Sequence, residues 1–280
     1  MATDLDGTLL DPSGKVADRT ARAVMAARAA GIHVIPVTGR PPQGLWHIAG
    51  RAGLGPYGVC SNGAVTVDLD RNEIIETETL ARDIALRLAT AMRLASPGIR
   101  LAVDIAEEFW YETGFFEVPA DWDETVVEVT DITEVLGPDC FKLVGRNPGM
   151  GAVELIAQLS DHVGQEGHLT TSGLDWVDVG APGITKAYAM DRVCDRLGVS
   201  VDEVVAIGDN HNDLPLLAWA GTAMAPANGI PEVLTIAHRV LPGNADHGVA
   251  TLLEELVAKP GRAGRRRSSQ RSARRRSATS

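Results

Sequence analysis

Short apolar runs and amphipathic stretches alternate at both ends of the chain. An Ala- and Arg-rich stretch at 17–31 predicts a helix that ends at Gly31. The β-branched run at 32–37 then predicts a buried strand that opens into a loop. The same order of strand, loop and helix recurs twice between 174 and 220. Repeated β–loop–α units predict a parallel sheet that is covered by helices on both faces.

The middle of the chain, from about 82 to 175, has a different pattern. Several apolar and aromatic runs there predict strands, and two amphipathic segments predict helices. We expect this part to form a separate mixed α/β unit, inserted into the parallel-sheet core. The predicted organisation is a discontinuous core over 1–82 and 177–260, an inserted α/β unit over 83–176, and a tail over 261–280.

The composition is that of an ordinary soluble globular protein, with 45% apolar and 22% charged residues. No run approaches the roughly 18–20 apolar residues of a membrane span, and the acids near the start exclude an apolar leader. We therefore expect no membrane span and a cytoplasmic location. Three widely spaced cysteines predict buried thiols, and argue against disulfides or a zinc site. They are Cys60, Cys140 and Cys194.

Basic residues are concentrated at the end of the chain. The segment 261–280 holds eight of the 26 Lys and Arg and no acid, so 1–260 is strongly acidic, with 37 Asp and Glu. An acidic body does not indicate specific nucleic-acid binding. The composition of the tail favours a disordered segment, and non-specific contacts with phosphate groups are its functional alternative.

Four polar motifs fall where predicted strands end or helices begin, the edge at which open α/β sheets bind ligands. Each motif alone is common in turns, and their shared position makes the joint case. They are DLDGT at 4–8, TGR at 38–40, GDNHND at 208–213, and Lys186 after a glycine-bearing loop.

The first motif places two carboxylates one residue apart. In an extended chain such residues point the same way, so we expect Asp4 and Asp6 to share one site. Asp209 and Asp213 would add further carboxylates, and like charges raise one another's pKa. Mg²⁺, which prefers oxygen ligands, and the ammonium of Lys186 would offset this charge.

Such a group of residues suits phosphoryl transfer. Asp4 would attack phosphorus, and Asp6 would protonate the leaving oxygen and then deprotonate water. Mg²⁺ and Lys186 would offset the charge on the phosphoryl oxygens, while Thr38 and backbone N–H groups position them.

Other ligand classes fit the same residues poorly. Neither acidic loop has the Gly and Glu that an EF-hand requires at its sixth and twelfth positions. The GxGxxG match at 53–58 follows helical residues and precedes a strand, the inverse of the dinucleotide-binding order. No P-loop pattern is present. His211 is interpreted as a variable loop position that could line the site.

The segments DLDGTLL, VTGR, GITKAYAM and GDNHNDLPLL together resemble the four ordered motifs of the haloacid dehalogenase superfamily of phosphohydrolases. SNGA at 61–64 and the long insertion are similar to the Cof-type branch, and the likeness covers 1–258. The resemblance implies a Rossmann-like, doubly wound core with an inserted α/β cap. It also implies a Mg²⁺-dependent phosphatase that acts on small phosphorylated metabolites through an aspartyl phosphate.

The resemblance also implies a role for individual residues. Asp4 is then the nucleophile and a Mg²⁺ ligand, and Asp6 is the acid/base, with its backbone carbonyl on the metal. Thr38 and Gly39 hold phosphate, and Lys186 pairs with phosphate and with Asp4. The remaining implied roles are metal ligation by Asp209, metal support by Asp213, phosphate contact by Asn212, and the rim of the site for Arg40, Asn62 and His211.

Three departures from the family pattern stand out. Only three residues precede Asp4, so we expect a chain extended upstream to have a more stable first strand. The run at 223–228 differs from the usual AMGNA, which leaves the role of Asn228 open. Ala187 follows the lysine where Gly is common, which affects packing more than chemistry.

Several alternatives stay open on the sequence. A phosphomutase, or a non-catalytic protein that binds phosphorylated ligands, would use the same residues. A monomer and a homodimer are equally compatible with the pattern. The aromatic residues of the insertion form either the core of the cap or a wall over the substrate; they are Trp110, Tyr111, Phe115, Phe116 and Trp122.

Overall fold

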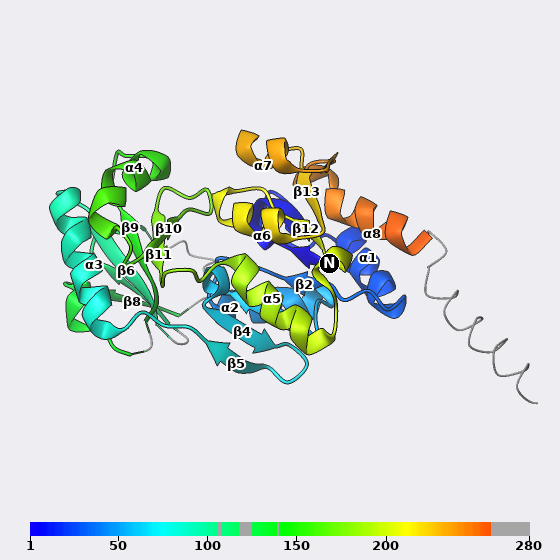
Figure 1. Cartoon of the computed structure of the whole chain (residues 1–280), viewed down its shortest axis with the longest axis horizontal. Coiled ribbons are helices and arrows are strands. Elements are labelled where there is room, and N and C mark those ends of the chain that lie inside the picture. Colours follow the sequence, from blue (N-terminus) through cyan, green and yellow to red (C-terminus); the bar gives the residue numbers. More distant parts are fainter. Residues whose placement is uncertain (106–107, 118–124, 139, 259–280) are drawn as a thin grey trace, which may run out of the picture.

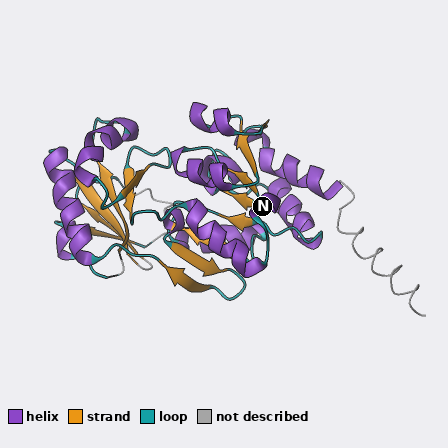
Figure 2. Ribbon diagram, in the orientation of Figure 1, coloured by secondary structure: helices purple, strands orange, loops and turns teal. Residues whose placement is uncertain are grey.

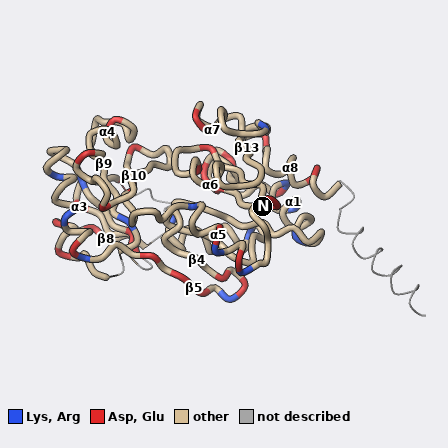
Figure 3. The backbone as a smooth tube through the Cα atoms, viewed as in Figure 1, with Lys and Arg blue, Asp and Glu red and all other residues tan. Residues whose placement is uncertain are grey.

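A computed structural model describes residues 1–105, 108–117, 125–138 and 140–258 of the chain. Two sheet-containing parts lie side by side, with the chain's N-terminus in the right-hand part of Figure 1. The predicted basic tail lies outside the described residues. No helix in the described part is long and apolar enough to cross a membrane. Figure 3 shows acidic and basic positions interspersed over both parts.

The first sheet is fully parallel and holds the start of the chain at its centre. Its order is β14-β13-β12-β1-β2. Ala2 in β1 aligns with Ala206 on one side and with Ile35 on the other. A strand of only two residues is therefore paired along both edges. The strands are β1 (Ala2–Thr3), β2 (Ile35–Pro36), β12 (Val205–Ile207), β13 (Thr222–Pro226) and β14 (Arg239–Leu241).

Helices cover both faces of this sheet, as Figure 2 shows. Alternating strand residues feed two apolar clusters, so that Ile207 packs on the α1 and α8 side and Ala206 packs on the α5 and α6 side. The predicted parallel-sheet core with helices on both faces is confirmed. The helices are α1 (Asp18–Ala29), α2 (Pro42–Ala52), α5 (Lys186–Leu197), α6 (Leu214–Trp219), α7 (Pro231–Ile236) and α8 (Gly248–Ala258).

A small antiparallel sheet extends this core. A bridge between Val37 and Val59 connects the end of β2 to β3. The hairpin that follows turns at the predicted residues 70–72. The GxGxxG match at 53–58 is the end of α2 and the start of β3, which is not the order of a dinucleotide-binding turn. The strands are β3 (Tyr57–Cys60), β4 (Val65–Asp68) and β5 (Glu73–Thr77).

The inserted part is a six-stranded sheet of order β10-β11-β9-β6-β7-β8, antiparallel except for the β7–β8 pair. Two helices cover one face, and an apolar cluster lies between them and the sheet. We call this part the cap, because its other face lies toward the core. Its elements are α3 (Arg82–Ala95), α4 (Ala152–Val163), β6 (Arg100–Ile105), β7 (Glu108–Glu112), β8 (Val126–Val129), β9 (Cys140–Arg146), β10 (His168–Thr170) and β11 (Val177–Gly180).

The strand β11 corrects one assignment made from the sequence. It reads like the first strand of a core β–loop–α unit, but it pairs antiparallel with β9 and β10 in the cap sheet. Residues 177–180, predicted to begin the second core segment, therefore lie in the inserted sheet. We propose that the chain returns to the core between Gly180 and Lys186, the first residue of α5.

Aromatic residues form a cluster on the cap face that is turned away from α3 and α4. The ring of Phe115 is fully buried, with ring centroids of Phe116 and Trp176 each 5.6 Å from its own. Trp110 packs on the opposite face, and Trp122 lies outside the described residues. Phe109, Tyr111 and Phe115 are buried in this cluster, whereas Phe116 and Trp176 are partly exposed. The cluster consists of Phe109, Tyr111, Phe115, Phe116 and Trp176.

The three cysteines are buried thiols, as predicted.

Candidate active site

The carboxyl end of the central strand β1 opens into a tight turn. The N–H of Asp4 still donates to the carbonyl of Ile207, at 2.9 Å, as the last contact of the sheet. Gly7 adopts a left-handed φ of 77°, and the N–H of Leu10 closes the turn on the carbonyl of Leu5. A Cβ atom on Gly7 would collide with the carboxylate of Asp209. The turn therefore requires glycine both for its conformation and for space.

Lys186 reaches this turn from the start of α5. Thr185 caps the helix by accepting the N–H of Tyr188 at 3.2 Å. The Nζ atom of Lys186 donates to Oδ1 of Asp4 and to Oδ1 of Asp213, both at 2.7 Å. The lysine is completely buried. Burial by itself lowers its pKa, but Asp213 and Asp4 more than offset this, and the pKa of Lys186 is raised. The side chain is held as an ammonium.

The loop after β12 supplies two further carboxylates with different surroundings. Oδ2 of Asp213 accepts the backbone N–H groups of Asp209 at 2.9 Å and Asn210 at 3.1 Å, so this side chain fixes the loop. Oδ1 of Asp209 accepts the hydroxyl of Thr8 at 2.6 Å. Thr8 belongs to the DLDGT motif, and its hydroxyl therefore joins the first motif to the last.

Asp4, Asp209 and Asp213 form a buried carboxylate cluster, in which one oxygen of each lies within 4.8 Å of the others. Burial raises the pKa of Asp4 well above its usual range; Lys186 opposes the rise, and Asp213 and Asp209 add to it. Burial, followed by Asp213, raises the pKa of Asp209 to about 6. One ammonium does not compensate three buried carboxylates. Oxygen donors at this spacing fit a hard divalent cation.

The carboxylate of Asp6 lies outside the group of three, although its charge still contributes to the raised pKa of Asp4 and of Asp209. Its carboxylate is half-exposed and accepts two hydrogen bonds from the guanidinium of Arg40, both at 2.7 Å. Asp4 and Asp6 therefore face different cations. The turn that begins at Leu5 carries Asp6 to the rim, and Arg40 pairs with it there.

Three loops surround the cluster, and we call them the rim loops: 38–40 after β2, 61–63 after β3, and 208–213 after β12. The N–H of Asn62 donates to the carbonyl of Thr38 at 3.1 Å, and Nδ2 of Asn212 donates to Oδ1 of Asn62 at 3.0 Å. Gly39 lies against both amides, because a Cβ there would be 3.0 Å from Oδ1 of Asn62. His211 is half-buried in the third loop. The structure thus brings the predicted residues of all three loops together.

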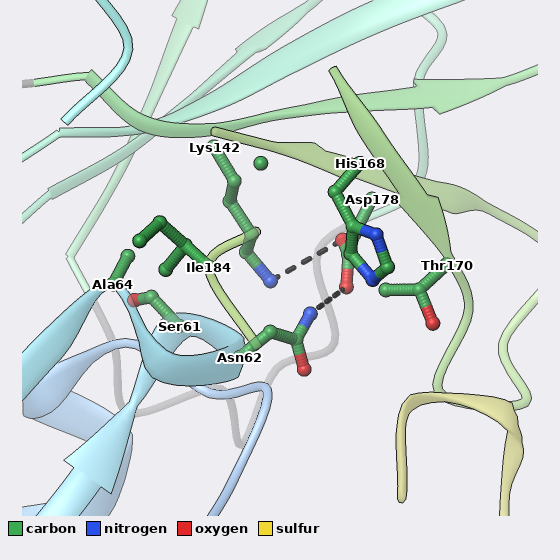
Figure 4. Close-up of a pocket in the computed structure, with 9 residues that line it drawn as sticks. Ser61, Asn62, Ala64, Lys142, His168, Thr170, Asp178 and Ile184 are labelled. Carbon is green, nitrogen blue, oxygen red and sulfur yellow. Dashed lines mark hydrogen bonds and ion pairs between the residues drawn. The ribbon is translucent and has the colours of Figure 1, made fainter. Parts of the chain in front are cut away.

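Three charged residues of the cap face these loops, and none was singled out from the sequence. Nζ of Lys142 donates to the carbonyl of Gly39 at 2.8 Å and lies 3.2 Å from Oδ1 of Asp178. Oδ2 of Asp178 accepts Nδ2 of Asn62 at 2.7 Å, and Oδ2 of Asp104 accepts the hydroxyl of Ser61 at 2.5 Å. Figure 4 shows Lys142 and Asp178 pointing from the cap strands toward the loop of Asn62. The cap is docked on the rim loops.

Comparisons with known proteins agree with this geometry. The family model for haloacid dehalogenase-like hydrolases matches residues 1–253. The chain belongs to the haloacid dehalogenase-like hydrolase family. It is 30% identical to YxeH of Bacillus subtilis (strain 168), over 92% of this chain and 97% of that protein. YxeH is named there as a putative phosphatase. The resemblance seen in the four motifs is confirmed.

Two further similarities describe the breadth of this family. The hydrolase is 27% identical to the pyridoxal phosphate phosphatase YbhA of Escherichia coli (strain K12), over 90% of this chain and 96% of that protein. Its fold matches a solved haloacid dehalogenase-like hydrolase from B. subtilis with a TM-score of 0.80 and 22% identity, over 91% of this chain and 98% of the other. The parallel core with an inserted cap sheet is thus the fold of its relatives.

The charged cap residues of this hydrolase did carry a signal in the sequence. Each is the single charge within an apolar run of the sequence: Asp104 in LAVDI, Lys142 in CFKLV and Asp178 in WVDVG. Asn228, whose role the sequence left open, also has a place, since its Nδ2 donates to the carbonyl of Gly7 at 2.8 Å. Asn228 supports the turn of the first motif.

Proposed function

We propose that this hydrolase is a Mg²⁺-dependent phosphatase that releases phosphate from small phosphorylated metabolites through an aspartyl phosphate on Asp4. The observation that carries the proposal is the buried contact of Lys186 with Asp4, next to Asp209 and Asp213. A carboxylate nucleophile beside an ammonium and further oxygen ligands is the arrangement that phosphoryl transfer requires. Family membership supports the same class of reaction.

The chain's own residues divide the work of the reaction. Lys186 holds Oδ1 of Asp4, which leaves Oδ2 to bond to phosphorus while the bond to the ester oxygen breaks. Asp6 gives a proton to that oxygen, and then takes a proton from the water that displaces Asp4 from phosphorus. Thr38, Gly39, Asn212 and Lys186 hold the phosphoryl oxygens. Phosphate leaves, and Asp4 is restored.

The acidic cluster is the proposed metal site. Asp4 and Asp209 would hold Mg²⁺, with the backbone carbonyl of Asp6 as a further oxygen. Both oxygens of Asp213 are already bound by protein donors, so Asp213 supports the site by fixing the loop of Asp209. When bound, Mg²⁺ offsets the negative charge of the carboxylates and of the phosphoryl oxygens.

The named relatives guide the proposal for the substrate class. A cavity of about 10 Å³, roughly the room of one water molecule, lies where the cap meets the loop of Asn62, and it is lined by residues that include Lys142 and Asp178. YbhA is named for pyridoxal phosphate, and another relative, YitU of Bacillus subtilis (strain 168), for 5-amino-6-(5-phospho-D-ribitylamino)uracil. We propose a compact sugar, nucleotide or cofactor monoester.

Hydrolysis of p-nitrophenyl phosphate, with Mg²⁺ and after its removal by EDTA, tests the proposal. We expect metal-dependent release of p-nitrophenol, which Asp4→Asn abolishes while the variant keeps its fold, as shown by an unchanged circular dichroism spectrum. Asp161→Asn is the matched control, because Asp161 is exposed on α4. Wild-type turnover by Asp4→Asn would overturn the mechanism. Isomerised sugar phosphate without free phosphate would indicate a phosphomutase, and ligand binding without hydrolysis would indicate a binding protein.

A further inference from the structure

The cap contacts every rim loop of the proposed phosphate site. Lys142 holds the carbonyl of Gly39 at 2.8 Å in the loop after β2. Asp178 holds the amide of Asn62 at 2.7 Å in the loop after β3. The carbonyl of Thr171, just after β10, accepts the N–H of Asn212 at 3.2 Å in the loop after β12. One face of the cap sheet therefore bridges three separate core loops.

Lys142 and Asp178 form a buried pair within this bridge. Lys142 is 6% exposed and Asp178 is 1% exposed, and they come from the neighbouring strands β9 and β11. Buried charges lose their hydration, and they are tolerated where partners replace the lost water. Here the remaining partners are the carbonyl of Gly39 and the amide of Asn62, both in the core. With the cap docked, Nζ of Lys142 and Oδ2 of Asp178 each have a hydrogen-bond partner in the core, and Oδ1 of Asp178 has its ion pair with Lys142.

The contact of Asp178 sets the direction of two amide groups in series. An ionised carboxylate can only accept hydrogen bonds, so Nδ2 of Asn62 faces Asp178 and Oδ1 of Asn62 faces away. That oxygen accepts Nδ2 of Asn212 at 3.0 Å. The second N–H of the Asn212 amide is then left for a phosphate oxygen. The orientation of Asn212 thus depends on a residue of the cap that lies two hydrogen bonds away.

We infer that Lys142 and Asp178 are positioning residues for the phosphate group itself, in addition to any contact of the cap with the rest of the substrate. Docking of the cap orders Gly39, Asn62 and Asn212 for phosphate. The inference rests on the proposed function, which assigns Gly39 and Asn212 to the phosphate. A cap that recognised only the leaving group would leave the affinity for inorganic phosphate unchanged, and this difference separates the two roles.

The probe is inorganic phosphate, which has no leaving group. We measure the inhibition constant of phosphate against p-nitrophenyl phosphate for the full chain and its variants. We also measure the rise in melting temperature that phosphate causes in each of them with Mg²⁺ present. Asp178→Ala breaks the link to Asn62. The double variant Lys142→Met with Asp178→Ala removes both charges of the pair together with the link to Asn62, and it leaves Asp104 with the hydroxyl of Ser61 as its partner. Gln43→Ala is the control, because Gln43 joins α2 to the cap through the N–H of Thr125 at 2.8 Å, outside the rim loops.

We expect Asp178→Ala and the double variant to lower the affinity for inorganic phosphate at least about fivefold, which corresponds to one ordinary hydrogen bond. The rise in melting temperature that phosphate causes should be smaller in both variants. Gln43→Ala should stay within about twofold of the wild type, because it leaves every phosphate contact in place. Wild-type phosphate affinity in either folded cap variant would overturn the positioning role while the phosphatase stands. A wild-type chain that neither hydrolyses p-nitrophenyl phosphate nor responds to phosphate would overturn both.

Discussion

The Nζ atom of Lys186 lies 2.7 Å from Oδ1 of Asp4, although the two residues are 182 positions apart in the chain. The same nitrogen lies 2.7 Å from Oδ1 of Asp213. The contact therefore joins the end of β1, the start of α5 and the loop after β12 at one point. A completely buried ammonium between two buried carboxylates contributes to the fold as well as to the proposed chemistry.

Replacing Lys186 with methionine should destabilise the folded protein strongly in the absence of metal. The substitution keeps the apolar stem but leaves three buried carboxylates without their ammonium. Breaking a buried pair in this way costs about 3–5 kcal/mol. Mg²⁺ should restore part of the loss, because a cation that binds only the folded state stabilises it. Urea unfolding with and without Mg²⁺ measures both effects.

Lys15→Met is the matched control for this prediction. Lys15 is exposed in the loop before α1, and its substitution should leave the free energy of unfolding within about 0.5 kcal/mol of the wild type. An equal free energy of unfolding for Lys186→Met and Lys15→Met would show that the buried ammonium is not needed to hold the cluster.

The positions of the candidate site residues could be predicted because their signals are local. Each motif stands at the end of a strand or the start of a helix, and parallel strands bring such ends to one edge of the sheet. The structure brings Asp4, Lys186, Asp209 and Asp213 together there. The distances between residues so far apart in the chain do not follow from the motifs. They depend on the pairing of β1 with β12 and β2.

Other features depend on partners that lie far away in the chain. The sequence of β11 is compatible with either sheet, and its pairing with β9 decides the question. Asp6 is close to Asp4 in the chain, but its pairing with Arg40 depends on how two loops meet. The docking role of Asp104, Lys142 and Asp178 could not be predicted, because the sequence does not show which cap face lies against the core. A lone charge in an apolar strand is the local sign of such a face.

Gly7→Ala should disrupt the proposed metal site. Gly7 has a φ of 77°, so any side chain is strained there, and a Cβ atom would collide with the carboxylate of Asp209. The collision acts on a cluster residue, and we expect a loss of Mg²⁺ affinity of at least about tenfold, the equivalent of roughly 1.4 kcal/mol. Titration of Mg²⁺ by calorimetry measures the affinity directly, without reference to turnover.

Gly14→Ala separates the strain from the collision. Gly14 has nearly the same φ, 73°, but a Cβ atom there would meet nothing within 4 Å. The left-handed backbone strain should cost each variant about 1–2 kcal/mol of stability, because an L-residue is disfavoured in that region. Only Gly7→Ala should change the affinity for Mg²⁺. Equal affinities in the two variants would mean that Asp209 does not need its present position to bind the metal.

Asp104→Asn should stabilise the protein at alkaline pH and have little effect at acid pH. Burial raises the pKa of Asp104 to about 6; Lys142 and the hydroxyl of Ser61 oppose the rise, and Asp178 adds to it. Oδ1 of Asp104 is buried and accepts no hydrogen bond in the described structure. Since the pKa is higher in the folded state than the ordinary 3.8, folding favours the protonated form. The ionised carboxylate therefore costs stability, and this cost grows as the pH rises from about 4 to about 6.

The asparagine cannot ionise, so its advantage over the wild type should follow the same curve. We expect about 1–2 kcal/mol above pH 7, which is less than the full linkage value because the charge-assisted bond from Ser61 is lost. The difference should shrink toward pH 4, where Asp104 in the wild type is protonated in the folded state. Urea unfolding of both proteins from pH 4 to pH 8 gives the curve, with Asp161→Asn as the exposed control. A difference that is independent of pH would indicate that the carboxyl of Asp104 does not change its charge over this range.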